Sequence, residues 1–384
     1  MLPPRDNLAA RHAQLRRVIA GLGVERLLVT SLPNVSWLTG FDGSSAAALV
    51  GPAAVVLVVD GRYVDEAGHI AAHADGLVRI ATVAKTYDET IASLITAAPE
   101  PIGFEAGALT VWRHHWLGAT LQAAQWPADR LIATSNAVEA CRVVKDAWEI
   151  AVLREAGARL SAVAQGILAD FRPGARETDL AQAIETGLRR AGFTRPAFDT
   201  IVASGPRAAL PHGRASDRTI QPGEPVVLDF GGVYGGYCVD LTRTVCSGPA
   251  GSELQHWYDA VVAAQAAAIG AVRPGQAAGA IDREARQQLE LRGLGERFTH
   301  GTGHGLGLEV HEAPRIGPPR PEPMHRPGAG VASMPDHLEP GMVFTVEPGV
   351  YVAGRGGVRI EDDVLVTSSG VDVLTSVPRT LVLD

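Results

Sequence analysis

Two aspartates on either side of a glycine-rich centre are the first residues whose types and spacing suggest chemistry. The stretch 225–245 contains two runs rich in Val, Leu, Phe and Thr around that centre, which predicts a β-hairpin. A symmetric turn between Tyr234 and Gly235 would place Asp229 directly opposite Asp240. Like charges in that position destabilise a strand pair, and an unpaired carboxylate in apolar surroundings is unfavourable. A divalent cation between them resolves both problems; a solvated hairpin with two surface acids is the alternative for this stretch alone.

Three histidines follow in a glycine-rich segment, at offsets of four and seven residues: His300, His304 and His311. Residues four apart share one face of a helix, but four glycines between 301 and 307 oppose a stable helix. We therefore expect a loop or irregular strand that brings the imidazoles to a common point. The glycines do not indicate a nucleotide-binding loop, because no capped helix follows them.

Two further carboxylates end or interrupt apolar strands. Glu347 follows an apolar strand and precedes a Pro-Gly turn, so it is either a buried ligand or a surface acid at a strand end. Along 357–366, alternation of side chains places Arg359, Glu361 and Asp363 on one face. The arginine beside a glutamate indicates either a simple ion pair or a ligand with a partner that orients it.

Together these segments supply four carboxylates and an imidazole, which would neutralise and bind two divalent cations. Oxygen-dominated ligation favours Mn²⁺, with Fe²⁺, Co²⁺ or Zn²⁺ as alternatives. No thiolate belongs to the set, which argues against a structural zinc site. Two adjacent cations activate a water for attack, so the expected chemistry is hydrolytic.

At this point the sequence resembles a known family. The motifs are Leu-Asp-Phe-Gly at 228–231, Val-Asp-Leu-Thr-Arg at 239–243, His-Gly-Thr-Gly-His at 300–304, Val-His-Glu at 310–312, Thr-Val-Glu-Pro-Gly at 345–349 and Val-Arg-Ile-Glu-Asp-Asp at 358–363. They resemble the M24 metallopeptidases of pita-bread fold, and more narrowly the proline-specific branch of Xaa-Pro aminopeptidases and Xaa-Pro dipeptidases (prolidases). The N-terminal part is similar to the creatinase-type domain of that branch.

The resemblance implies specific roles for nine residues. The implied metal ligands are Asp229, Asp240, His304, Glu347 and Glu361. The implied catalytic residues are His212, His311 and Glu347, and the implied substrate-binding residues are His300, His212, His311 and Arg359. The implied reaction is hydrolysis of the bond before proline, with Glu347 passing a proton to the prolyl nitrogen. The histidines His212 and His311 would hydrogen-bond the developing charges.

The elements that must position these residues occur as an internal repeat. A helix, the tripeptide Arg-Pro-Gly, a second helix and then strands occur first around 172–174 and again around 273–275. Asp146 and Glu149 resemble a capping box that opens the first long helix. We expect an α+β domain of two related halves, with helices outside and the site between them.

The preceding residues alternate between predicted strands and helices and indicate a smaller α/β domain with a mixed sheet. Predicted strands cover 26–30, 46–50, 53–60, 78–83 and 102–105, predicted helices cover 8–22, 65–74, 87–98 and 110–124, and 31–34 is expected to be a turn. We place the domain boundary near residue 140, giving a creatinase-type domain at 1–140 and a catalytic pita-bread domain at 141–384.

Composition excludes several classes of protein. The chain has 384 residues, of which 46% are hydrophobic and 20% are charged, and its formal net charge is −8. It contains no Lys/Arg-rich run, which argues against nucleic-acid binding. Three cysteines without a paired spacing fit a reducing cytosol. No apolar run approaches a membrane span, and the first residues lack a signal-peptide core. We expect a cytoplasmic protein without membrane or nucleic-acid partners; a homodimer is implied by the resemblance only.

Alternatives remain open at this stage. Asn34-Val35-Ser36-Trp37-Leu38-Thr39-Gly40-Phe41 slightly favours the Xaa-Pro aminopeptidase over a strict Xaa-Pro dipeptidase, whose mark would be a basic group facing the proline carboxylate. A metal-free creatinase-type amidinohydrolase or a non-catalytic binding module would be expected to lack the full ligand set. The proline-rich insert at 317–336 is interpreted as a rim of the active site or a surface loop.

Overall fold

The computed structural model describes residues 1–319 and 330–383, and the chain divides into two compact units. The first comprises Met1–Arg142 and the described residues of 321–334, and the second comprises the described residues of 143–320 and 335–384. Half of the insert at 317–336, residues 320–329, lies outside the described residues, and its described part includes the short strand β13 (Gly330–Val331).

A seven-stranded mixed sheet forms the middle of the N-terminal unit. Its strand order is β13 (Gly330–Val331), β6 (Leu131–Ser135), β5 (Ile102–Glu105), β1 (Arg26–Val29), β2 (Ala47–Val50), β3 (Val55–Val59) and β4 (Val78–Thr82). Strand β2 is antiparallel to both β1 and β3, whereas the other pairs are parallel. The predicted small α/β domain with a mixed sheet is confirmed.

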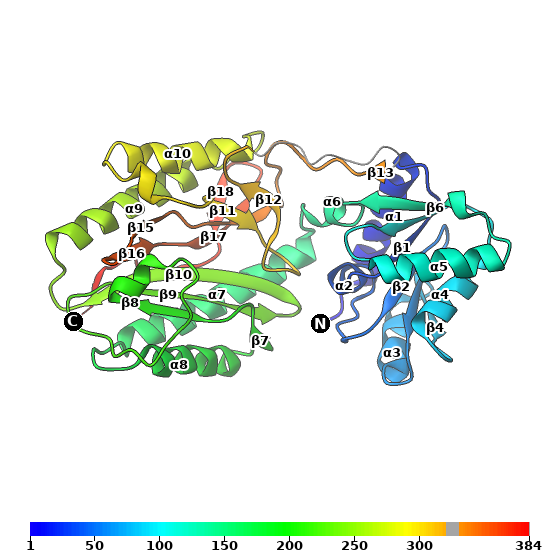
Figure 1. Cartoon of the computed structure of the whole chain (residues 1–384), viewed down its shortest axis with the longest axis horizontal. Helices are drawn as coiled ribbons and strands as arrows, with labels where there is room; N and C mark the ends of the chain where they lie inside the picture. Colours follow the sequence, from blue (N-terminus) through cyan, green and yellow to red (C-terminus); the bar gives the residue numbers. More distant parts are fainter. Residues whose placement is uncertain (320–329, 384) are drawn as a thin grey trace. The chain divides into compact units, whose positions relative to one another are not determined.

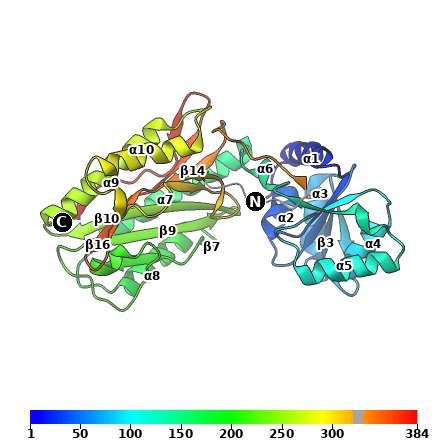
Figure 2. The same cartoon turned by 45° about the horizontal axis from the view of Figure 1, so that its top comes forward.

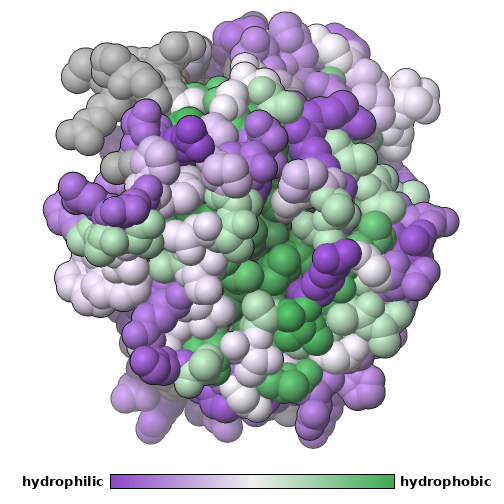
Figure 3. All heavy atoms as spheres, turned by 90° about the vertical axis from the view of Figure 1, so that its right-hand side faces the viewer, coloured by the Kyte–Doolittle hydropathy of each residue, from purple (hydrophilic) through white to green (hydrophobic). Residues whose placement is uncertain are grey.

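Helices cover both faces of this sheet (Figure 2). On one side lie α1 (Arg5–Gly21), α2 (Leu32–Thr39) and α3 (Val64–Ala74), and on the other lie α4 (Tyr87–Thr96) and α5 (Val111–Ala123). The short helix α6 (Glu139–Arg142) ends the unit. Figure 3 shows one face of this unit, on which apolar side chains gather near the middle and polar side chains lie around them.

The expected turn at 31–34 is wrong, because helix α2 begins there. Ser31 is the extended N-cap residue but its side chain makes no capping bond. Instead, the carboxylate of Glu105 accepts hydrogen bonds from the backbone N–H groups of Thr30 at 2.6 Å and Ser31 at 2.8 Å. A side chain from a distant strand therefore satisfies donors that the local sequence leaves open.

The second unit places paired helices outside its sheets (Figure 1). Helices α7 (Ala147–Ala169) and α8 (Glu177–Arg190) cover one side, and α9 (Ser252–Ala271) and α10 (Ala278–Glu290) cover the other. The predicted capping box of Asp146 and Glu149 is present at the start of α7. The predicted repeat of helix, Arg-Pro-Gly, helix and strands is confirmed. In the described part of the chain, no helix combines the length and apolar character needed to cross a membrane.

Three sheets lie between these helix pairs. One contains β19 (Val382–Leu383), β10 (Tyr237–Ser247), β9 (Val226–Tyr234), β7 (Arg195–Pro196) and β8 (Ile201–Ser204), which pairs with β9. The second has the order β12 (Glu312–Ile316), β11 (Gly303–Gly305), β14 (Val343–Val346), β17 (Asp362–Val366) and β18 (Val371–Val373). The third pairs β15 (Gly349–Val352) with β16 (Gly356–Arg359).

The predicted hairpin is confirmed, but the predicted opposition of its aspartates is wrong. Strands β9 and β10 are joined by Gly235 and Gly236, whose φ values of 57° and 89° suit a tight hairpin turn. This turn lies one residue later than expected, so Asp229 pairs with Thr242 and Asp240 pairs with Gly231. The aspartates are therefore diagonal neighbours on one face of the strand pair.

A single strand over 357–366 is also not observed. Strand β16 ends at Arg359, and β17 begins at Asp362 in a different sheet. Simple alternation across this stretch is therefore wrong, and Glu361 lies at the crossing between the two strands. Its position depends on both sheets rather than on the pleat of one strand.

Candidate metal centre

All nine residues singled out in the sequence line one pocket of about 1060 Å³ in the second unit. They are Asp229, Asp240, His304, Glu347, Glu361, His212, His300, His311 and Arg359. The strand pair β9–β10 supplies the aspartates, β11 supplies His304, and the ends of β14 and β16 supply the remaining carboxylates and the arginine. Segments far apart in the chain thus meet at one cavity.

Three of these side chains come close enough to share one cation. Ligand atoms of Asp240, His304 and Glu361 all lie within 4.8 Å of one another. Asp229 and Glu347 line the same pocket but are not part of this closest group. Glu347 nevertheless lies beside it, because its Oε1 is 3.5 Å from Nε2 of His304.

The ring of His304 is oriented for ligation. Its Nδ1 is 3.1 Å from the carbonyl oxygen of Gly305, which can only accept, so Nδ1 carries the proton. Nε2 is then left with a lone pair, and this is the nitrogen that faces Glu347. Burial, together with the nearby His311, lowers the pKa of His304 to about 4, which keeps the ring neutral.

Arg359 pairs with Asp229. A simple ion pair between Arg359 and Glu361, which was one of the two interpretations of the sequence, is therefore not observed. Its Nη2 binds Oδ2 of Asp229, and its Nη1 donates to the Tyr351 hydroxyl at 2.8 Å. That hydroxyl lies 2.9 Å from Nε2 of His300, whose Nδ1 donates to the carbonyl of Gly301 at 2.8 Å. Since Nδ1 holds the proton, Nε2 accepts from Tyr351. A continuous hydrogen-bonded chain therefore joins Asp229 to His300.

Three buried carboxylates of the site have pKa values raised above their ordinary range. Burial, and then repulsion from Asp229, raises the pKa of Asp240 well above its ordinary value. Burial, and then repulsion from Asp240, does the same to the pKa of Glu361, and burial raises the pKa of Glu347 to about 8. Among the described residues, Oε1 of Glu361 is buried with no hydrogen-bond partner. Carboxylates that repel one another around an unpartnered oxygen fit divalent cations as the missing charge.

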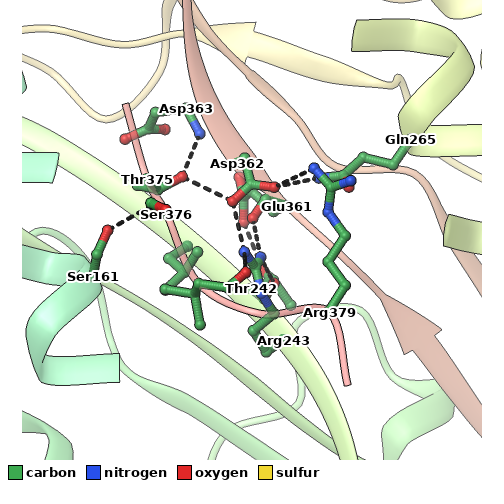
Figure 4. Close-up of polar contacts among 12 residues, drawn as sticks. Ser161, Thr242, Arg243, Gln265, Glu361, Asp362, Asp363, Thr375, Ser376 and Arg379 are labelled. Carbon is green, nitrogen blue, oxygen red and sulfur yellow. Dashed lines mark hydrogen bonds and ion pairs between the residues drawn. The ribbon is translucent and has the colours of Figure 1, made fainter. Parts of the chain in front are cut away.

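A polar network behind the pocket holds Glu361 in place (Figure 4). Thr242 donates its hydroxyl to Oε2 of Glu361 at 2.6 Å, and Arg243 donates to the Glu361 carbonyl at 2.6 Å. The neighbouring Asp362 points the other way and accepts from Arg243 at 2.7 Å. Its remaining donors are Gln265, Thr375 and Arg379, at 2.9, 2.9 and 3.0 Å. The network fixes which way the chain faces where β16 passes into β17.

Sequence reasoning missed several residues at this site. Tyr351, Thr242 and Arg315 received no role, although the first two contact proposed site residues and the third lines the pocket. For Thr242, the signal was its spacing of two residues from Asp240, which places both on one strand face. For Arg315, the signal was that a basic residue follows His311 by four positions. No local signal in the sequence distinguished Tyr351.

Family models match both parts of the chain. Metallopeptidase family M24 matches residues 151–368, and the creatinase/prolidase N-terminal domain matches residues 11–144. Among curated proteins, the uncharacterized peptidase YqhT of Bacillus subtilis (strain 168) is 36% identical over 376 residues, covering 96% of this chain and 99% of that protein. The Xaa-Pro dipeptidase of Pyrococcus furiosus is 38% identical over 248 residues, covering 64% and 67%.

Solved structures agree over nearly the whole chain. The Xaa-Pro dipeptidase from Bacillus anthracis has a TM-score of 0.87 and 35% identity, covering 98% of this chain and 99% of that chain. The X-Pro aminopeptidase from Thermotoga maritima MSB8 has a TM-score of 0.81 and 30% identity, covering 95% and 99%. These likenesses confirm the pita-bread fold with a creatinase-type N-terminal domain that the motifs predicted. The chain belongs to metallopeptidase family M24.

Proposed function

We propose that this chain hydrolyses the bond between an N-terminal residue and a following proline, with two divalent cations. The observation that carries the proposal is the convergence of four carboxylates and an imidazole on one pocket, with Asp240, His304 and Glu361 within 4.8 Å. Relatives named Xaa-Pro dipeptidase and X-Pro aminopeptidase support the proline specificity. In this proposal residues 141–384 carry catalysis and residues 1–140 form the N-terminal domain.

The residues that would hold the cations are Asp229, Asp240, His304, Glu347 and Glu361. When bound, two adjacent divalent cations supply Lewis-acid activation of water and of the substrate carbonyl. The donor set consists of carboxylate oxygens and one imidazole nitrogen, without sulfur. It supports Mn²⁺, with Co²⁺, Fe²⁺ or Zn²⁺ as alternatives. Four carboxylates balance two such ions.

The chain's own groups bind the substrate and move its protons. Glu347 lines the pocket and is the carboxylate that we propose to pass a proton to the prolyl nitrogen. His212 and His311 line the same pocket and would donate hydrogen bonds to the carbonyl oxygen as its charge develops. His300 and Arg359 are fixed by Tyr351 and would shape the prolyl side.

The first candidate within this proposal is an Xaa-Pro aminopeptidase. A pocket of about 1060 Å³ lies just above the range of roughly 300–1,000 Å³ that is usual for small-molecule sites, so it has room for residues beyond proline. An aminopeptidase needs that room, since its products include the rest of a longer peptide.

Arg315 favours a second candidate, a strict Xaa-Pro dipeptidase. Its side chain lines the pocket, and its Nη1 donates to the Pro318 carbonyl at 2.5 Å. A guanidinium binds a carboxylate strongly, so Arg315 would recognise the free carboxylate of a substrate that ends at proline. Two further arginines line the pocket: Arg286 pairs with Asp282 at 2.7 Å and donates to the His300 carbonyl at 2.5 Å, and Arg359 pairs with Asp229.

One experiment separates these candidates. The Mn²⁺-loaded protein and its Arg315→Ala variant are compared on Ala-Pro and Ala-Pro-Ala, with exposed Arg190→Ala as the matched control. A dipeptidase cleaves only Ala-Pro and loses this activity with Arg315, whereas an aminopeptidase cleaves both and tolerates the change. Cleavage of neither peptide by protein that holds metal contradicts the proline specificity. Protein that retains no metal and cleaves neither peptide supports a metal-free creatinase-type amidinohydrolase or a non-catalytic binding module.

A further inference from the structure

One buried carboxylate, that of Glu177, accepts hydrogen bonds from both ends of the segment that carries His212. Glu177 is the first residue of α8 and its side chain is fully buried. Its Oε1 accepts from the backbone N–H and the hydroxyl of Ser204 at 2.8 and 2.7 Å. Its Oε2 accepts the same two groups of Ser216, at 3.0 and 2.7 Å. The two oxygens thus bind the two ends of the segment 204–216.

A charged partner and the start of a helix help to hold the Glu177 carboxylate in place. Arg207, which lies inside the segment, donates its Nε to Oε2 of Glu177 at 3.1 Å. Arg218 donates to the Ser204 hydroxyl at 2.6 Å and pairs with Glu224 at 2.6 Å. The first turn of a helix also favours a negative charge. Hydrogen bonds to a charged acceptor are among the stronger ones, so this arrangement holds firmly.

His212 depends on that arrangement for its position. The segment passes from β8 through a short 3₁₀ turn, Gly205–Ala209, and then has no regular structure through His212. Across the part of the chain that the structure describes, the His212 ring makes no hydrogen bond of its own. Pro211 and His212 nonetheless line the pocket, while the adjacent Leu210 is 52% exposed. The backbone of the segment must therefore place the ring, and the two ends of that backbone meet at Glu177.

Helix α8 reinforces the same end of the segment through its backbone. The N–H of Thr178 donates to the Ser216 carbonyl at 3.1 Å, and the N–H of Glu177 donates to the Arg218 carbonyl at 3.0 Å. Strand β8 packs beside α8, so Ser204 is within reach of the helix start (Figure 1). These backbone bonds of α8 reach only the later end. The earlier end is held in the sheet, where Ser204 pairs with Val226, and it is tied to the start of α8 by the Glu177 side chain.

We propose that Glu177 is a positioning residue for catalysis: it closes the segment 204–216 so that His212 projects into the pocket. The catalytic part of this inference rests on the proposed function, in which His212 contacts the substrate. The structural part, closure of the segment by one carboxylate, does not depend on it.

Glu177→Gln is the sharpest variant. It keeps the size of the side chain, but it removes the charge and presents an amide NH₂ to groups that are themselves donors. Leu188→Ala is the matched control, because Leu188 is buried on the same helix and has no part in the segment's hydrogen bonds. Its truncation loosens helix packing without touching Ser204 or Ser216.

Hydrogen–deuterium exchange tests the closure without any reference to activity. In full-length Glu177→Gln, amides within 205–216 are expected to exchange at least about tenfold faster, which corresponds to about 1.4 kcal/mol of lost protection. The same amides in Leu188→Ala are expected to exchange as in the wild type. Unchanged exchange in Glu177→Gln overturns the proposal.

A double-mutant cycle with His212→Ala tests the catalytic role. Glu177→Gln alone is expected to lower kcat/KM for an Xaa-Pro peptide at least about tenfold, but to add less than about twofold in the His212→Ala background. A full additional loss in that background would show that Glu177 acts on folding generally and would overturn the positioning role. Leu188→Ala is expected to have the same effect in both backgrounds.

Two outcomes of these experiments call for a further measurement or a separate conclusion. If Glu177→Gln does not fold, Ser204→Ala with Ser216→Ala removes both hydroxyls and leaves the charge paired with Arg207; faster exchange within 205–216 supports the closure and unchanged exchange overturns it. If the wild type cleaves no Xaa-Pro peptide, the proposed function fails and the catalytic role fails with it. The exchange measurement still decides whether Glu177 closes the segment.

Discussion

Thr242 donates its hydroxyl to Oε2 of Glu361 across a separation of 119 residues, at 2.6 Å. Both residues are buried, and the other oxygen of that carboxylate is buried without a partner among the described residues. The hydroxyl therefore restrains the rotation of a carboxylate that belongs to the closest group of candidate ligands, with Asp240 and His304.

This relationship predicts that the hydroxyl tunes metal affinity. Thr242→Val keeps the shape of the side chain but leaves Glu361 without its donor, and metal affinity is expected to fall by roughly 10–100-fold. Thr242→Ser keeps the hydroxyl and is expected to stay close to the wild type. Calorimetric titration of the metal-free protein with Mn²⁺ measures both, and equal affinities for the Val and Ser variants would contradict the role.

Asp240 is expected to be indispensable for metal retention. Asp240→Asn removes one charge from the closest group of three ligands, so bound metal and peptidase activity are expected to be lost together. Elemental analysis of the purified protein, followed by an assay of the same sample, checks this. Asp372→Asn is the control, because that aspartate is half exposed and pairs with Arg154, away from the pocket lining. Activity that survives without metal would rule out the mechanism.

The Arg243–Asp362 pair is expected to contribute to folding as well as to the site. Both side chains are buried, at 3% and 1% exposure, so removing one leaves an uncompensated charge. Asp362→Asn is expected to lower the free energy of unfolding by about 3–5 kcal/mol. Asp372→Asn, which removes one charge from the half-exposed Arg154–Asp372 pair, is expected to lower the free energy of unfolding by less than about 1 kcal/mol. Denaturant unfolding measures both, and similar losses would show that burial of the pair has no special effect.

Glu105 predicts how the N-terminal unit responds to pH. Burial raises its pKa from 4.5 to about 6 in the folded protein, despite hydrogen bonds from Ser31 and Asn34. The folded state therefore binds this proton more tightly than the unfolded state. The resulting contribution to stability is complete below pH 4.5 and is lost as the pH rises through 6, and it amounts to about 2 kcal/mol.

The free energy of unfolding of the wild type and of Glu105→Gln is measured at about ten pH values between pH 4 and pH 8. Because glutamine does not titrate, the difference between the two proteins is expected to change across the window from about 4.5 to about 6. A difference that is constant with pH would show that Glu105 has the same pKa in both states.

Features that depend on neighbours in the chain were determined by the sequence itself. The existence of a hairpin within 225–245, the capping box of Asp146 and Glu149, and the repeated helix pairs all follow from turn chemistry and periodicity over a few residues. The carboxylates were recognisable as candidate ligands, because carboxylates in apolar segments need a compensating positive charge, and the resemblance to the M24 family implied the full set of nine site residues. All nine predicted site residues line one pocket.

Features that depend on distant partners were decided only by the tertiary structure. A one-residue shift of the turn made Asp229 and Asp240 diagonal rather than opposite, since register is set by the whole strand pair. Helix α2 begins where a turn was expected because Glu105, 75 residues away, binds the N–H of Thr30. Arg359 binds Asp229, 130 residues away, rather than its near neighbour Glu361, because β16 and β17 belong to different sheets. A residue's type states which bonds it can make, but only the packing of sheets and helices brings one particular partner within reach.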